Sequence, residues 1–132
     1  MTRHLHLLSA VVLLALGAAT GASAAAQPEA KSQCFASNTW KNWTASPDGD
    51  KLYLRVGLND VYEVDLSPGS HVRKYPGSFL VNRVRGSSWI CSALDLDLTL
   101  SDDVGMRQPV IARSMRRLTP AEVAAIPAKY RP

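Results

Sequence analysis

The feature that most constrains this chain is a two-residue alternation of apolar and polar side chains, which recurs between Thr39 and Leu118. Alternation with this period places every second side chain on one face of a β-strand, whereas an amphipathic helix needs apolar residues three and four positions apart. No segment between Thr39 and Leu118 sustains the helical spacing. The sequence therefore predicts a mostly β domain.

The clearest alternation lies in two neighbouring runs, residues 51–56 and 61–66. One face of the two runs carries only apolar side chains: Leu52, Leu54, Val56, Tyr62, Val64 and Leu66. The four residues between the runs include Gly and Asn, as short hairpin connections do. We expect an antiparallel hairpin with this face toward the core and with Val61, Glu63 and Asp65 toward solvent.

Four further segments have strand composition, and turns rich in Pro, Gly and Ser separate several of them. They are residues 39–45, 79–85, 94–100 and 109–118. In the third, alternation places all four leucines from Leu94 to Leu100 on one face, with Asp95 and Asp97 on the other. Six short strands at close spacing predict a small antiparallel β-sandwich or barrel of about six strands.

One helix is predicted, near the C-terminus. Thr119, Pro120 and Glu122 match a capping box, with the threonine as N-cap, proline at the first helical position and glutamate at the third. Pro127 ends the helix after about two turns. A helix this short needs tertiary contacts, so we expect it to dock on the sheet through Val123 and Ile126.

The first 24 residues have the composition of a signal peptide. Arg3 precedes an apolar run that ends in small residues, and cleavage is expected after residue 24 or 26. The run of about 15 residues is short for a membrane anchor, which needs about 20, and the residues before Cys34 do not suit a lipidation site. We expect residues 27–33 to form a flexible lead-in and residues 34–132 to form a single exported domain, periplasmic or secreted.

The two cysteines of the chain, Cys34 and Cys91, both lie in this domain. Exported proteins with an even cysteine count usually pair their cysteines, because the compartment is oxidising. A redox or catalytic thiol would need a CxxC motif or an electropositive niche on a helix, and the sequence has no CxxC motif. The sequence predicts a structural disulfide.

Several features together resemble a family of small secreted bacterial proteins catalogued only as a domain of unknown function. They are Cys34, the Trp40-x-x-Trp43 segment, the hairpin with its Tyr62, the stretch from Ile90 to Asp95, and the closing Leu118-Thr119-x-x-Glu122. The resemblance covers nearly all of the predicted domain. It implies export and a compact fold, and it implies no reaction.

Few residues suggest catalysis or metal binding. His71 is the single histidine left after cleavage, and it follows a turn of Ser, Pro and Gly. Asp95 and Asp97 on one strand face would stand about 7 Å apart, near the lower limit for the carboxylates of an inverting glycosidase. Such pairs usually come from different elements that flank a cleft, so a solvated strand face is the favoured interpretation of the two aspartates. Asp102 and Asp103 suggest at most a weak calcium site, and we expect no catalytic residue, metal or cofactor.

Basic residues gather in two segments that could form a stripe if their strands were neighbours. They are Arg83, Arg85, Arg113, Arg116 and Arg117, joined by Arg107. Such a stripe could meet phosphate or another anionic surface. Nucleic acid is not expected, because aromatic side chains do not alternate with the basic ones as stacking platforms would. Ordinary surface charge, which keeps a small domain soluble, is the competing interpretation.

The three tryptophans, Trp40, Trp43 and Trp89, are expected to fill the core and cover the disulfide. Trp40 and Trp43 are three residues apart, so a regular strand would expose one of them unless a bulge intervenes. An exposed Trp is a good anchor for a partner. The leading hypothesis is a non-enzymatic envelope or periplasmic binding or structural module. The alternatives are a small hydrolase-like enzyme using Asp95, Asp97 and His71, and an inhibitor of a secreted enzyme.

Overall fold

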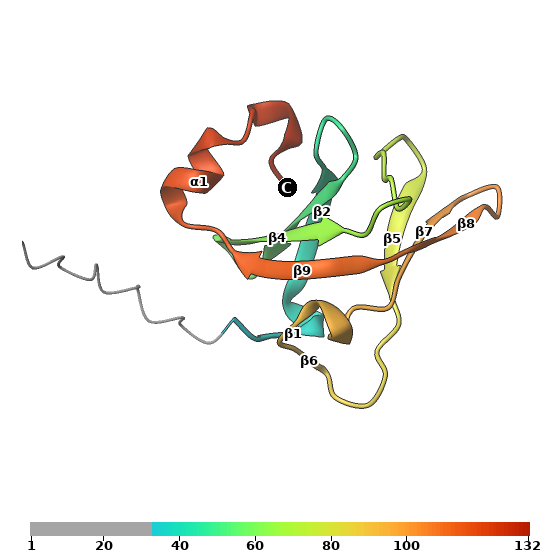
Figure 1. The fold of residues 1–132 in the computed structure, drawn as a ribbon, viewed down its shortest axis with the longest axis horizontal. Helices are drawn as coiled ribbons and strands as arrows, with labels where there is room; N and C mark the ends of the chain where they lie inside the picture. The colour runs from blue at the N-terminus through green and yellow to red at the C-terminus, as the bar shows by residue number, and fades with distance from the viewer. Residues whose placement is uncertain (1–32) are drawn as a thin grey trace, which may run out of the picture.

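The computed structural model describes residues 33–132, so the predicted signal peptide and the lead-in up to residue 32 lie outside the described residues. The domain is mostly β, with antiparallel sheets and one short α-helix near the C-terminus, which confirms the predicted fold class (Figure 1). Its strands form a four-stranded sheet, a three-stranded sheet and a two-stranded ribbon. Between residues 33 and 132, no helix is long and apolar enough to cross a membrane.

The four-stranded sheet, here called the large sheet, has the strand order β2-β3-β4-β9. Its strands are β2 (Trp40–Ala45), β3 (Lys51–Val56), β4 (Asp60–Leu66) and β9 (Ala112–Arg117). β3 and β4 form the predicted hairpin, with Leu54 opposite Tyr62. In the turn before β3, Gly49 has a φ of 80°, and a Cβ there would lie 2.9 Å from the carbonyl oxygen of Val72. Both constraints favour glycine at this position.

The three-stranded sheet, here called the small sheet, has the order β5-β7-β8. Its strands are β5 (Ser78–Asn82), β7 (Leu98–Asp102) and β8 (Arg107–Val110). Only Ile111 separates β8 from β9, so the segment predicted as one strand, residues 109–118, passes from one sheet into the other. Ser70 Oγ accepts a hydrogen bond from the Ile111 amide at the bend, and the Ser67 amide donates to the Ile111 carbonyl. Strands that change sheets at a bend form the corners of sandwiches, and the two sheets here are sandwich-like without closing a barrel.

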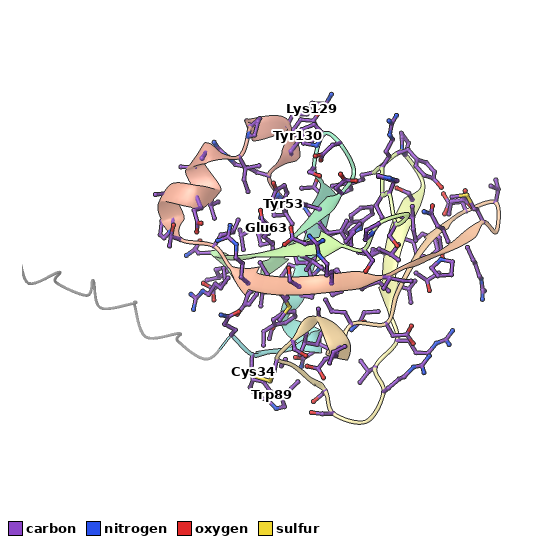
Figure 2. The ribbon with its side chains drawn as sticks, in the orientation of Figure 1. Cys34, Tyr53, Glu63, Trp89, Lys129 and Tyr130 are labelled. Carbon is purple, nitrogen blue, oxygen red and sulfur yellow. A yellow bond between two sulfur atoms is a disulfide. The ribbon has the colours of Figure 1, made fainter. Side chains whose placement is uncertain are left out.

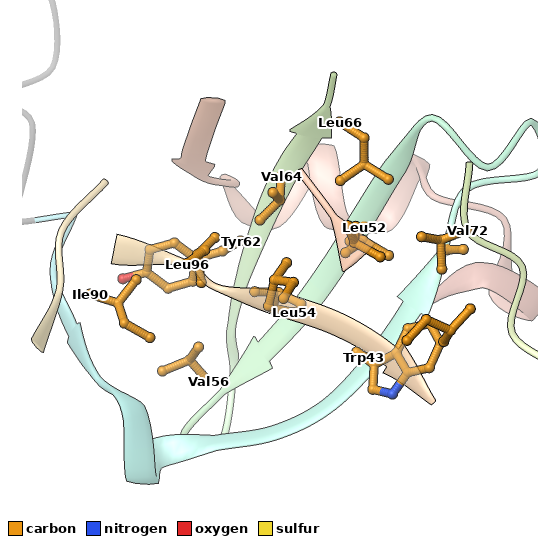
Figure 3. Close-up of a cluster of buried hydrophobic side chains, with 14 of the residues drawn as sticks. Trp43, Leu52, Leu54, Val56, Tyr62, Val64, Leu66, Val72, Ile90 and Leu96 are labelled. Atoms are coloured by element: carbon orange, nitrogen blue, oxygen red, sulfur yellow. The ribbon is translucent and has the colours of Figure 1, made fainter. Parts of the chain in front are cut away.

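Both sheets contribute to one core (Figure 3). The large sheet supplies Leu52, Leu54 and Val64, which are completely buried, and the small sheet supplies Leu98 and Leu100. The face of the hairpin predicted to be apolar therefore packs as expected. The two sheets therefore bury these side chains against each other in a shared core.

The C-terminal segment covers the opposite face of the large sheet (Figure 1). The prediction that Val61 and Glu63 face solvent is wrong, because both are buried. α1 (Pro120–Ala125) and η3 (Ala128–Tyr130) fold back over this face, and Glu63 contacts Lys51 and Arg116. Val61 packs in a second cluster with Leu118 and Ile126. Tyr53 and Tyr130 line the same cluster and lie close together in Figure 2.

The predicted capping box starts α1. The Glu122 amide donates to Thr119 Oγ1 over 3.3 Å, and the Thr119 amide donates to Glu122 Oε2 over 2.8 Å. At the other end, the Arg131 guanidinium donates to the carbonyl oxygens of Ala124 and Ile126. Both helix ends are therefore satisfied, which stabilises a helix of only six residues.

The predicted disulfide joins Cys34 to Cys91, 57 positions apart in the sequence. The bond flanks the two-stranded ribbon of β1 (Phe35–Ala36) and β6 (Trp89–Ile90), and the side chains of Phe35 and Ile90 enter the shared core. The crosslink thus ties the start of the domain to its middle. Trp89 lies beside Cys34 at this end of the molecule (Figure 2) and is 56% exposed.

The tryptophans only partly follow the prediction. A bulge between Trp40 and Asn42 shifts the register of β2 against β3, and this allows Trp40 to pack against the core that buries Trp43. The bulge, one of the two predicted solutions, is the one the chain adopts. Trp89 is the exception, since its ring is largely exposed rather than part of the core.

The prediction of one strand over residues 94–100 is wrong for its first half. Asp95 Oδ2 accepts hydrogen bonds from the amides of Cys91 and Ser92, and these bonds close the turn of η2 (Ala93–Asp95). Leu94 is consequently 94% exposed, and only the three later leucines are buried. The predicted strand over residues 79–85 likewise ends early, at Asn82.

Candidate functional site: the outer face of the small sheet

The small sheet has one face in the core and one face that residues 33–132 leave open. Its register places Phe79, Ser101 and Arg107 in one row across the open face, and Val81, Thr99 and Pro109 in the next row. The intervening positions, among them Leu98 and Leu100, point into the core, because successive side chains of a strand alternate between faces.

The open face forms a hollow of about 510 Å³, here called the outer hollow. Its apolar side chains are substantially exposed: Phe79 by 45%, Val81 by 42% and Met106 by 41%. Thr99 and Ser101 add hydroxyl groups between them. Pockets of this size and character hold small molecules. Apolar side chains gathered in a hollow, rather than scattered singly, are typical of a binding surface.

Two arginines stand at opposite corners of the outer hollow. Arg107 lies on β8, and Arg83 follows the end of β5. Arg83 lies two strands away from Arg107 across the sheet and four residues away along the strand direction. Strand spacings therefore put their Cα atoms about 16 Å apart. The Arg83 amide donates to the Asp97 carbonyl over 2.9 Å, which fixes the backbone at that corner. Within the described part of the chain, neither guanidinium forms an ion pair.

The two carboxylates that line the hollow are already engaged. Asp97 Oδ2 lies 2.7 Å from Arg85 Nε. Asp102 Oδ1 accepts from the Met106 amide over 2.8 Å, and Asp102 Oδ2 accepts from the Tyr75 hydroxyl over 3.0 Å. The Met106 amide is the main cause of a lowered pKa of Asp102. The charge left available to a ligand is therefore the positive charge of the two arginines.

The predicted basic stripe does not form. It requires that β5 and β9 be neighbours, but they belong to different sheets, and β9 pairs with β4. Its β9 members are also partly neutralised: Arg116 contacts Glu63 and Glu122, and Arg117 pairs with Asp60.

The five predicted residues thus have different surroundings. Arg83 lines the outer hollow, and Arg85 binds a carboxylate at its rim. Arg113 is exposed on β9, where it belongs to the surface of the large sheet together with Arg116 and Arg117.

The structure does not bring together the residues of the enzyme hypothesis. His71 Nδ1 lies 2.6 Å from Asp50, while Asp95 caps η2 and Asp97 pairs with Arg85. Across residues 33–132, no hydrogen bond joins any two of the three. The Cys91 amide, followed by the Ser92 amide, lowers the pKa of Asp95. The lowered pKa favours the ionised carboxylate, which is the form that accepts the hydrogen bonds of a cap.

No cluster of three His, Cys, Asp or Glu side chains suited to a metal ion occurs in the described range. The Asp102 carboxylate suggested for calcium accepts hydrogen bonds from backbone amides instead.

Sequence reasoning missed the outer hollow, although residues 79–82 held a usable indication. Phe79, Leu80 and Val81 are consecutive apolar residues, so both faces of β5 carry apolar side chains. When only one face of a sheet packs on the core, the apolar side chains on its other face have to be exposed.

Searches of protein-family models, curated proteins and solved structures found no match to this chain. The resemblance to a family of small secreted bacterial proteins therefore stays a prediction.

Proposed function

We propose that this protein is an exported, non-enzymatic binding module. Its outer hollow would take a small amphipathic anion, with an apolar body and a carboxylate, phosphate or sulfate group. The observation that carries the proposal is the exposed apolar face of the small sheet, with an arginine at each of two opposite corners that has no ion-pair partner among the residues the structure describes. The resemblance to secreted proteins of unknown function is consistent with such a role.

The apolar part of the ligand would lie across β5 and β8. Phe79, Val81 and Met106 would lose solvent contact on binding, and burial of apolar surface contributes about 25 cal/mol per Å². The backbone beneath is held by ladder bonds on both sides of β7, so the site exists before the ligand arrives. Binding then needs little ordering of the protein, which lowers its entropic cost.

The anionic group would select one of the two corners. A guanidinium binds carboxylate or phosphate through paired N–H donors, and such charge-assisted bonds are about twice as strong as neutral ones. Since Asp97 and Asp102 already have partners, they do not compete for Arg83 or Arg107.

Export is supported by the disulfide and by the predicted signal peptide. The Cys34–Cys91 bond is typical of an oxidising compartment outside the cytosol. In that setting, the amphipathic anion could be a free metabolite or the headgroup and chain of an envelope lipid. Both sources share the chemistry that the site would recognise.

The test uses octyl phosphate as the probe, below its micelle concentration, in an NMR titration of the folded domain. We expect saturable amide shifts at Val81, Thr99 and Arg107. Arg83→Gln or Arg107→Gln should weaken binding about tenfold if the guanidinium bonds the phosphate. Phe79→Ser should weaken the binding of octyl phosphate more than that of inorganic phosphate.

Arg113→Gln is the matched control, because it removes an exposed arginine from the large sheet and should leave the affinity unchanged. Octyltrimethylammonium tests the sign of the charge and should not bind at these residues. Equal binding of the two probes, or equal loss in the Arg113 control, would show that the hollow does not recognise an anion. Vesicles that carry an anionic lipid, compared with free octyl phosphate, distinguish the two sources.

A further inference from the structure

One edge of the small sheet ends in unpaired backbone groups. β5 pairs with β7 on one side, and no strand among residues 33–132 pairs with it on the other. The Arg83 amide bonds to the Asp97 carbonyl, so the odd-numbered residues of β5 direct their backbone groups toward β7. In an antiparallel ladder the alternate residues point the other way. The amide and carbonyl groups of Leu80 and Asn82 therefore point away from the sheet.

A groove of about 320 Å³ runs along this edge, here called the edge groove. Residues of β5 and its continuation form one wall, and η1 (Ser37–Thr39) and the start of β2 form the other. Its lining residues are all uncharged: Ser37, Asn38, Trp40, Leu80, Asn82 and Val84. Asn82 Nδ2 is buried and has no hydrogen-bond partner within the described range, while its Oδ1 accepts from the Asp97 amide over 2.9 Å. The groove thus combines uncharged polar and apolar side chains with the outward-pointing backbone groups of β5.

Two other edge strands of the two sheets, β2 and β8, are protected. On β2, the Asn42 carbonyl accepts from Trp40 Nε1 over 2.9 Å, and the Trp43 carbonyl accepts from Lys74 Nζ over 2.7 Å. On β8, Pro109 has no amide N–H to offer. Prolines and lysines on edge strands prevent pairing with other chains. β5 contains neither residue, so this edge is open to an added strand.

We propose that β5 accepts an extended peptide segment of another protein as a fourth strand of the small sheet. Only an extended polypeptide presents alternating N–H and C=O groups at the strand spacing that Leu80 and Asn82 offer, and strand addition of this kind is a common mode of peptide recognition. The uncharged lining favours a segment with neutral, apolar side chains toward Trp40 and Val84. The proposal concerns the edge of the sheet, not its outer face, and it does not depend on the proposed anion site.

The probe is a library of random 12-residue peptides displayed on phage and selected on the intact, disulfide-bonded domain. The selected peptides should alternate polar and apolar residues. In hydrogen-exchange NMR, the free protein should exchange the Leu80 and Asn82 amides quickly and the Val81 amide slowly. A bound peptide should protect Leu80 and Asn82 as well.

Leu80→Pro removes one outward N–H without removing a bond to β7, and Leu80→Ala is the matched control with the same loss of side-chain contacts. We expect Leu80→Pro to weaken peptide binding at least tenfold relative to Leu80→Ala. If Leu80→Pro does not fold, peptides with alternate amides N-methylated test the same bonds on the wild-type protein, and one of the two methylation registers should abolish binding.

Four results would overturn the proposal, three of them in the peptide experiments. These three are failure to select any alternating peptide, protection that appears away from β5, and equal binding by the Pro and Ala variants. A fourth is a concentration-dependent dimer in sedimentation that protects Leu80 without any peptide, since it would make a second copy of this chain the occupant.

Discussion

The two sheets of this domain differ in what covers their outer faces. On the large sheet, α1 and η3 cover Val61, and a second apolar cluster forms there. On the small sheet, Phe79 and Val81 occupy the equivalent outward positions and remain exposed. A chain that covers one sheet and leaves apolar side chains on the other does not gain stability from those exposed side chains. Their exposure is the basis of the binding site proposed above.

Charges on the two outer faces differ in the same way. On the large sheet, Glu63 contacts Lys51 over 3.3 Å and Arg116 over 2.9 Å, so the cations are neutralised within the protein. On the small sheet, Arg83 and Arg107 have no ion-pair partner among residues 33–132. Arg116 thus links the large sheet to its cover, whereas Arg83 and Arg107 on the small sheet are available to a ligand.

The disulfide gives the largest expected effect, and it should act on both sheets at once, because Phe35 and Ile90 belong to the shared core. Closing a loop of this size contributes about 4 kcal/mol in the chain-entropy model. Cys34→Ser or Cys91→Ser should therefore lower the Tm by more than about ten degrees in calorimetry. The double variant should be no less stable than either single variant.

If the shared core couples the sheets, tryptophan fluorescence and the exchange of β7 amides should report the same transition in the cysteine variants. Separate transitions for the two sheets would contradict the single core, and unchanged stability would contradict the contribution of the crosslink.

The second effect compares the two outer faces directly. Ile126→Ala removes a buried side chain from the cover of the large sheet and should cost about 2 kcal/mol or more in the free energy of unfolding. Phe79→Thr removes a larger side chain from the open face, but it should change that free energy by only about 0.5 kcal/mol. Urea denaturation of both variants measures the difference, and similar losses would refute the distinction between a covered and an open face.

The smallest effect is a pH dependence of the cover. The Thr119 amide, followed by Arg116, lowers the pKa of Glu122 from 4.5 to about 2. Because the folded state favours the ionised form, this stabilisation is complete above pH 4.5 and is lost as the pH falls toward 2. The wild type should lose stability more steeply over this range than Glu122→Gln in urea denaturation. Parallel curves for the two proteins would show that Glu122 contributes no such stabilisation.

The parts of the fold that local patterns specify were predictable. The hairpin of β3 and β4 follows from alternation, and α1 follows from its capping box. The disulfide follows from two cysteines in an exported chain. The failure at residues 94–100 has a local cause as well, because the Asp95 carboxylate competes for backbone amides that a strand would use otherwise. Ser92 and Asp95, three residues apart, were the overlooked indication.

The candidate site was not predictable, because it depends on which strands become neighbours. Alternation does not reveal that Arg107 and Arg83 flank β7 from opposite edges, nor that Arg113 lies in the other sheet. It also does not reveal which of two apolar faces receives a cover. That choice depends on where the C-terminal segment folds back, which is a long-range contact.

The bend at Ile111 has a consequence for dividing this protein into pieces. One continuous segment supplies β8 to the small sheet and β9 to the large sheet. A cut at Ile111 would therefore break the direct connection between the two sheets. A cut in the exposed turn at Leu58 and Asn59 would leave that segment whole. Split reporters and circular permutants of this domain should therefore be opened at the β3–β4 turn, and the joint at Ile111 should be kept intact.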